Sequence, residues 1–190
     1  PLIVTDRGSS KLSFVQELRS LLLKAGISSE LFFDISPNPV GNEIEAGCIA
    51  YRDGNHDAII GIGGGSGMDG AKDICLTVNN NFDLWAFDYN KPAPQIRNSD
   101  PFPKLIMVPT TAGTGAETES TAMVTPARKG MKFCLDHPQL KVSAAILDPS
   151  LTLGLPPNLT AWTGVDALTH AIEAYIVPDF HPLCDGAAIE

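Results

Sequence analysis

Two residues near the end of the chain have the spacing of a metal-binding pair. Asp166 and His170 lie four positions apart in the segment TGVDALTHAIE, residues 163–173. On a helix this spacing puts both side chains on one face, so a carboxylate oxygen and an imidazole nitrogen can bind one divalent cation. Mixed oxygen and nitrogen ligands suit Fe²⁺ or Zn²⁺. The alternative is that Asp166 is the capping-box acid of Thr163 and that His170 is an ordinary helix residue.

A glycine-rich loop is the second candidate site. The sequence GIGGGSGMDGAK, residues 61–72, follows the apolar run at 57–60. A strand that enters such a loop and then a helix directs backbone N–H groups and the positive helix end at one point, which suits a pyrophosphate. The loop fits G-x-G-x-x-G, but no acidic residue ends a strand about 20 positions later, as the common dinucleotide fingerprint requires. The alternative is a tight turn with Ser66 as N-cap and Asp69 at the capping-box position.

A second loop of small residues follows the apolar run at 104–108. Its hydroxyl groups belong to Thr110, Thr111 and Thr114, and two glycines allow close backbone approach. Thr114 and Glu117 have the capping-box spacing, which predicts a helix start. In an open α/β sheet a ligand lies at the carboxyl ends of the strands, where both loops begin. We therefore expect both loops to face one ligand.

Asp6 and Asn38 also follow predicted strands and are expected at the same edge. A carboxylate at Asp6 can accept hydrogen bonds from a ribose diol and repels a 2′-phosphate, which favours NAD over NADP. The alternative is an ordinary turn aspartate in the segment TDRG.

The elements that position these residues alternate along the chain. Apolar runs predict strands at 2–5, 31–33, 58–62 and 104–108, and periodic patterns predict helices that end before Gly26, over 41–53 and over about 67–78. Residues 88–103, with four prolines, are predicted to be a loop. This order is typical of an α/β fold with a parallel sheet. Strand signals end near residue 150 and helical ones begin, so we expect an α/β domain over 1–149 and the beginning of an all-helical domain over 150–190.

Composition narrows the classes of partner. The net charge of −9 and the pI near 4.8 argue against nucleic acid and anionic membrane surfaces and favour a small molecule. Four cysteines without a CxxC pair indicate a reducing, cytoplasmic compartment. The chain begins without methionine and stops where a helix is predicted to start, so we expect it to be a fragment that lacks part of its N-terminal edge.

Taken together, these segments resemble the iron-containing (group III) alcohol dehydrogenases. The resemblance rests on GIGGGSGMDGAK, VPTTAGTGAE and ILDPSLTLGLPPNLTAWTGVDALTHAIEAY, with the early IVTDRG and SPNP, and it extends over essentially the whole chain. It implies a dehydroquinate-synthase-like architecture, in which an α/β dinucleotide-binding domain precedes an all-helical metal-binding domain. It also implies a homo-oligomer, a dimer.

The resemblance also implies roles for individual residues. Asp166 and His170 match the first two metal ligands, and the other two are histidines beyond residue 190. Three positions depart from the family pattern, namely Gly67, Gly70 and Ala116. The implied NAD contacts are Asp6 and Asn38 on the adenosine side, Gly64, Gly65, Ser66 and Asp69 at the pyrophosphate loop, and Thr110, Thr111, Thr114, Lys132 and Leu151 along the cofactor cleft.

The predicted activity is reversible hydride transfer between a primary alcohol or aldehyde and NAD. Fe²⁺, with Zn²⁺ as the alternative, would act as a Lewis acid on the substrate oxygen. A metal- and NAD-dependent lyase of the dehydroquinate-synthase-like superfamily is a second hypothesis, which the sparse Lys and Arg beside the metal helix disfavour. A third is a non-catalytic nucleotide-binding fragment.

Overall fold

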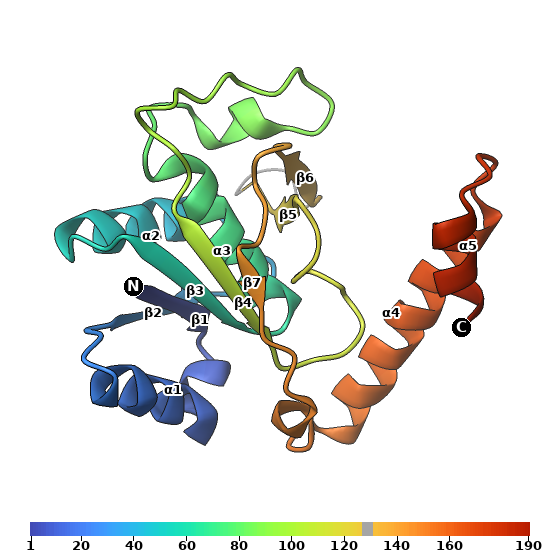
Figure 1. Cartoon of the computed structure of the whole chain (residues 1–190), viewed down its shortest axis with the longest axis horizontal. Helices are drawn as coiled ribbons and strands as arrows, with labels where there is room; N and C mark the ends of the chain where they lie inside the picture. Colours follow the sequence, from blue (N-terminus) through green and yellow to red (C-terminus); the bar gives the residue numbers. More distant parts are fainter. Residues whose placement is uncertain (127–130) are drawn as a thin grey trace.

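A parallel sheet lies at the centre of the α/β part of the molecule. The computed structural model describes residues 1–126 and 131–190. In this part of the chain the sheet has five strands in the order β2-β1-β3-β4-β7 (Figure 1). Their bounds are β1 Leu2–Asp6, β2 Glu30–Ile35, β3 Ala58–Gly63, β4 Lys104–Pro109 and β7 Ala144–Ala145.

Helices cover both faces of this sheet. They are α1 Ser13–Lys24, α2 Gly41–Asp53 and α3 Gly65–Thr77. Side chains alternate along β1: Leu2 and Val4 join the core under α2 and α3, whereas Ile3 joins the cluster that contains Val15 of α1. Figure 1 shows α2 and α3 on one side of the sheet and α1 on the other. The predicted α/β fold with a parallel sheet is confirmed.

Several described elements, β7 among them, lie outside the predicted pattern. β5 Thr121–Val124 and β6 Phe133–Asp136 form an antiparallel pair that is separate from the central sheet. Short 3-10 helices occur at Ser9–Lys11, Leu84–Phe87 and Pro149–Thr152. The predicted loop at residues 88–103 contains no helix and no strand and leads into β4, as expected. The 3-10 helix Leu84–Phe87 lies immediately before this loop.

The last two helices are α4 Pro157–Ile176 and α5 Pro182–Ile189, which pack on each other. Figure 1 shows them at the side of the α/β part, beyond the end of β4. Large apolar side chains of α4 are exposed, among them Trp162, Val165, Leu168 and Tyr175. None of the helices that the structure describes combines the length and the apolar character that crossing a lipid bilayer requires.

Two of the alternative capping interpretations are wrong. Helix α3 begins at Gly65 with Gly64 as its N-cap, so Ser66 and Asp69 lie inside the helix. Helix α4 begins at Pro157, because proline at the first helical position fixes a helical φ, and Thr163 lies well inside it. The Oγ1 of Thr163 donates to the Leu159 carbonyl at 2.9 Å, so Asp166 is not its capping-box acid.

The helix predicted to start at Thr114 is absent. Residues 111–120 form bends and turns, and Thr114 Oγ1 instead accepts from the Ala116 N–H at 3.3 Å. Gly115 has a φ of +67°, a left-handed conformation that interrupts a right-handed helix at its first turn.

Candidate functional site

Three neighbouring strands end at the same edge of the sheet. β1 and β3 pair with Val4 opposite Gly61, and β3 and β4 pair with Gly63 opposite Pro109. This register brings Asp6, the glycine loop after β3 and the threonine loop at 110–115 together. The Thr110 N–H donates to the Gly63 carbonyl at 2.9 Å, which joins the two loops. The predicted meeting of these segments at the carboxyl edge is therefore observed.

The two loops also pack against each other through side chains. A Cβ on Gly65 would lie 3.1 Å from Thr114 Cγ2, and a Cβ on Gly64 would lie 3.4 Å from Thr111 Cγ2. Gly63 has a φ of +144°, which L side chains rarely adopt. The glycines are thus required in part by the neighbouring loop and by backbone geometry, and not only by a ligand.

Two features of this edge are suited to an anionic ligand. Helix α3 begins here without a side-chain cap, so the N–H groups of its first turn have no such partner. Thr111 Oγ1 is buried and has no hydrogen-bond partner among the described residues. A buried hydroxyl without a partner is costly, so a ligand group that bonds to it would remove that cost.

Asp6 and Asn38 lie at this edge, near the N-terminus of α3. Asp6 is half-buried, and its carboxylate accepts hydrogen bonds from the turn formed by Gly8 and Ser9. Asn38 is exposed, has a φ of +62°, and donates from its backbone N–H to Ser66 Oγ at 3.4 Å. The structure therefore brings both residues close to the glycine loop.

Asp69 lies deeper, beneath the β5–β6 pair. Its Oδ1 is 3.5 Å from Lys72 Nζ, and the Lys72 ammonium, which is fully buried, donates to the Thr121 carbonyl at 2.6 Å. Burial raises the pKa of Asp69 to about 6, against the opposing effect of Lys72. The carboxylate thus ties α3 to β5, and its predicted place at the pyrophosphate remains a prediction.

Sequence reasoning missed Lys72 and Asp73, the other charged members of this buried cluster. Asp73 is fully buried, neither of its carboxyl oxygens has a hydrogen-bond partner among the described residues, and burial raises its pKa well above the ordinary value. The available signal was three charged residues within five positions of a helix whose other residues are small or apolar.

Among the described residues, no hydrogen bond or ion pair joins Lys132 or Leu151 to the two loops. Lys132 is exposed, immediately before β6. Leu151 lies in the 3-10 helix Pro149–Thr152 and packs against the α1-side cluster that contains Ile62 and Val108. Leu151 is therefore close to the strand ends, and the cofactor contacts of both residues remain predictions.

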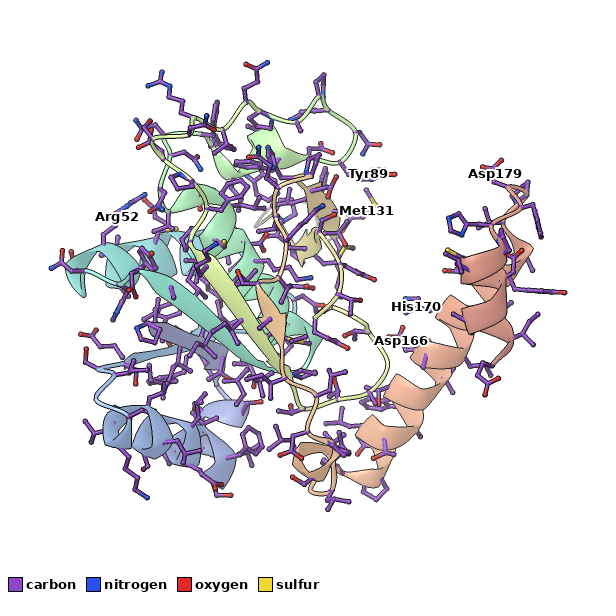
Figure 2. The ribbon with its side chains drawn as sticks, viewed as in Figure 1. Arg52, Tyr89, Met131, Asp166, His170 and Asp179 are labelled. Atoms are coloured by element: carbon purple, nitrogen blue, oxygen red, sulfur yellow. The ribbon has the colours of Figure 1, made fainter. Side chains whose placement is uncertain are left out.

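The candidate metal pair lies on α4. Asp166 is half-buried and His170 is exposed, and Figure 2 shows both side chains leaving α4 on the side that faces the α/β part. Within residues 1–126 and 131–190, no group of three or more His, Cys, Asp or Glu residues could hold a metal ion. Asp166 and His170 are thus two candidate ligands to which the described residues add no third, and their metal-binding role remains a prediction.

The threonine loop connects α4 to the sheet edge. A Cβ on Gly113 would lie 2.9 Å from the carbonyl carbon and 3.0 Å from the Cα of Thr163, closer than real side chains approach. Backbone therefore packs on backbone, three residues before Asp166. One short loop contacts both the glycine loop and the helix with the candidate metal ligands.

Comparison with known proteins identifies the family. The family model described as "Iron-containing alcohol dehydrogenase" matches residues 1–149. Choline dehydrogenase from Bacillus subtilis is 36% identical over an alignment that covers 99% of this chain and 46% of the relative. The chain spans about half the length of the curated relatives it matches.

Solved structures of related proteins have the same fold as this chain. The crystal structure of a 1,3-propanediol oxidoreductase superposes with a TM-score of 0.91 at 36% identity, covering 99% of this chain and 48% of that one. Sulfoacetaldehyde reductase from Bifidobacterium kashiwanohense, solved in complex with NAD⁺, has a TM-score of 0.85 at 30% identity, with 98% of this chain and 48% of that one covered. The sequence, the parallel sheet and the paired loops thus lead to one conclusion: the chain belongs to the iron-containing alcohol dehydrogenase family.

Proposed function

We propose that the chain is the nucleotide-binding half, with the first metal ligands, of an NAD-dependent alcohol dehydrogenase that interconverts a primary alcohol and an aldehyde. The observation that carries this proposal is the position of the threonine loop. Thr114 packs on the glycine loop and Gly113 packs on α4 at Thr163, so the nucleotide edge and the candidate metal helix are in contact through one segment. Hydride transfer needs cofactor and substrate held together in this way.

NAD fits the residues at the sheet edge. The N-terminus of α3 with Gly64, Gly65 and Ser66 would hold the pyrophosphate, and the unpartnered Thr111 hydroxyl offers a further hydrogen bond. Asp6 would bind the adenosine ribose. Further contacts belong to the proposal by family resemblance alone, namely Asn38, Asp69, Thr110, Thr114, Lys132 and Leu151.

A divalent iron fits the pair on α4. The Asp166 carboxylate and the His170 imidazole would hold it, together with ligands from outside the described residues. Oxygen and nitrogen donors of this kind also accept Zn²⁺, so metal analysis must decide between the two. When bound, the ion supplies Lewis-acid polarisation of the substrate oxygen.

The chain's own residues position the reactants. The glycine and threonine loops fix the dinucleotide at the carboxyl edge, and the Gly113–Thr163 contact sets how far α4 stands from it. Such positioning accounts for a large part of the rate of bimolecular reactions on enzymes. Residues 1–149 are the nucleotide-binding domain in this proposal, and residues 150–190 begin the all-helical metal domain of a dehydroquinate-synthase-like architecture.

The proposal also includes the cellular compartment and the oligomeric state of the enzyme. The four cysteines, Cys48, Cys75, Cys134 and Cys184, are free thiols, which favours the cytoplasm. Family resemblance favours a homodimer, which light scattering would test.

The test measures cofactor binding, iron content and turnover in the protein that carries the chain. We expect NADH to bind, primary alcohols to reduce NAD, and Asp166→Ala to remove iron and turnover together while NADH affinity stays the same. Glu173→Ala is the matched control, because it removes an exposed carboxylate from the same helix. Stoichiometric iron in the Asp166→Ala protein would exclude Asp166 as a ligand, and an absence of NADH binding in the parent would refute the proposed function.

A further inference from the structure

The carboxylate of Asp6 is held by its own turn. Oδ1 accepts from the Gly8 N–H at 2.8 Å and from the Ser9 N–H at 2.9 Å, and Oδ2 accepts from the Ser9 hydroxyl at 2.6 Å. Ser9 therefore bonds both oxygens of the carboxylate, one through its backbone and one through its side chain. Hydrogen bonds to a charged acceptor are the short, strong ones, so this turn fixes the orientation of the carboxylate.

Three of the four acceptor positions of this carboxylate are occupied. An ionised carboxylate offers about four lone-pair sites, two on each oxygen. Both sites of Oδ1 are used by backbone N–H groups, and one site of Oδ2 is used by Ser9. One acceptor site remains, on Oδ2. A ribose diol has two hydroxyl donors, so Asp6 alone cannot accept both without breaking its turn.

The Ser9 hydroxyl supplies the missing acceptor. Its proton is donated to Asp6 Oδ2, which leaves the lone pairs of its oxygen free to accept. Asp6 Oδ2 and Ser9 Oγ are 2.6 Å apart and therefore form one adjacent pair of acceptors. The pair borders the glycine loop: a Cβ on Gly63 would lie 3.3 Å from Asp6 Oδ2 and 3.6 Å from Ser9 Oγ.

Two neighbouring residues leave this pair available. A Cβ on Gly8 would lie 3.0 Å from Asp6 Oδ1, so glycine here lets the carboxylate fold back onto the turn. Arg7, the adjacent cation, pairs with Asp34 through Nε at 3.3 Å. Asp6 thus has no cationic partner among the described residues. Its negative charge is therefore available to repel an anionic group that binds at the sheet edge.

We propose that Ser9 is a specificity-determining residue for the nucleotide, which positions Asp6 and accepts the 2′-hydroxyl of the adenosine ribose, while the free site on Asp6 Oδ2 accepts the 3′-hydroxyl. The inference rests on the proposed function, because it requires NAD at this edge. An unphosphorylated diol satisfies both acceptors. A 2′-phosphate removes one donor and places its negative charge beside the fixed carboxylate, so the same pair excludes NADP.

The test compares Ser9→Ala with Ser10→Ala in the full chain. Ser10 is the matched control, because its hydroxyl donates to the Arg7 carbonyl at 3.0 Å and not to Asp6. We expect Ser9→Ala to raise the Kd of NADH about three- to tenfold, the effect of one lost hydrogen bond, and to change the Kd of NADPH less than about twofold. Ser10→Ala should leave both constants unchanged, and Ser9→Thr, which keeps the hydroxyl, should restore the preference for NADH.

A deoxy probe separates the contact from a structural effect. In the parent, NADH lacking the adenosine 2′-hydroxyl should bind more weakly than NADH, and Ser9→Ala should narrow that difference. Equal weakening of NADH, NADPH and the deoxy analogue would show that Ser9 acts only on the fold and would overturn the inference. An unchanged NADH-to-NADPH ratio in Ser9→Ala would overturn it as well and leave the proposed function standing. A parent that binds no NADH would overturn both.

Discussion

Replacing Gly113 with alanine tests whether the threonine loop sets the position of α4. The new Cβ would lie 2.9 Å from the Thr163 carbonyl carbon and 3.0 Å from its Cα, whereas carbon atoms pack best at about 3.5–4.0 Å. Backbone lies on both sides of this contact, so the loop and the helix must separate by about 0.5–1 Å. Overpacking of this kind costs about 1–3 kcal/mol in the free energy of unfolding.

The same displacement moves Asp166 and His170 away from the nucleotide edge. A misplacement of about 1 Å lowers enzymatic rates by up to about a hundredfold. We therefore expect Gly113→Ala to lower kcat about ten- to hundredfold, while the Kd of NADH changes far less, because Asp6 and the N-terminus of α3, the proposed ribose and pyrophosphate sites, belong to other segments. Steady-state kinetics and NADH titration measure the two quantities separately, and iron analysis shows whether the metal is retained.

Gly164→Ala provides the control. Gly164 is the next residue of α4 after Thr163, and a Cβ there meets no atom within 4 Å. Alanine should stabilise the helix by up to about 1 kcal/mol and leave kcat unchanged. If Gly113→Ala retains parental kcat while its melting temperature falls, the contact is only structural and the proposed positioning role of the loop is wrong.

Two further predictions concern helix α3 and the neighbouring strand β3. Gly67→Ala should raise the free energy of unfolding by about 0.5 kcal/mol, because its Cβ would meet Asp6 N, Ile62 O and Thr5 Cα at 3.4–3.6 Å. Gly61→Ala should lower the free energy of unfolding by about 1–3 kcal/mol, because its Cβ would lie 2.6 Å from Met107 Sδ. Denaturant unfolding that ranks the two variants the other way would contradict the packing described. Asp69 has a folded-state pKa of about 6, above the ordinary value of 3.8, so its contribution to stability should be full below pH 3.8 and lost as the pH rises through 6. Asp69→Asn should flatten the profile of unfolding free energy against pH across this window, and identical slopes in the variant and the parent would exclude Asp69 as the titrating group.

The sheet and its edge were predictable because their signals are local. β1, β3 and β4 are continuous apolar runs, and each helix between them follows its own periodicity. The parallel order then places Asp6 and both loops at one edge without knowledge of any individual contact. The β5–β6 pair was missed because its strands have four residues each and depend on each other for pairing. β7, with only Ala144 and Ala145, is a strand because β4 is beside it.

Errors in the sequence analysis arose where a local signal competed with the backbone around it. Thr114 and Glu117 have the spacing of a helix start, but the left-handed Gly115 between them turns the chain away from a helix. Thr163 and Asp166 have the same spacing, yet the helix had already begun at Pro157. The hydrogen-bond partner of the buried Lys72 was not predictable, since it is the Thr121 carbonyl, 49 positions away.

The contact between Gly113 and Thr163 explains a glycine that the nucleotide alone does not require. In the sequence, Gly113 and Gly115 are equivalent members of a small-residue loop that allows close approach of a ligand. In the structure they differ: Gly115 is needed for its positive φ, whereas Gly113 is needed because the backbone of α4 occupies the space of its side chain. The glycines of the two loops therefore do more than leave room for a ligand. They let three backbone segments, from the sheet edge, the threonine loop and α4, meet at one place, as the proposed hydride transfer between a dinucleotide and a metal-bound substrate would require.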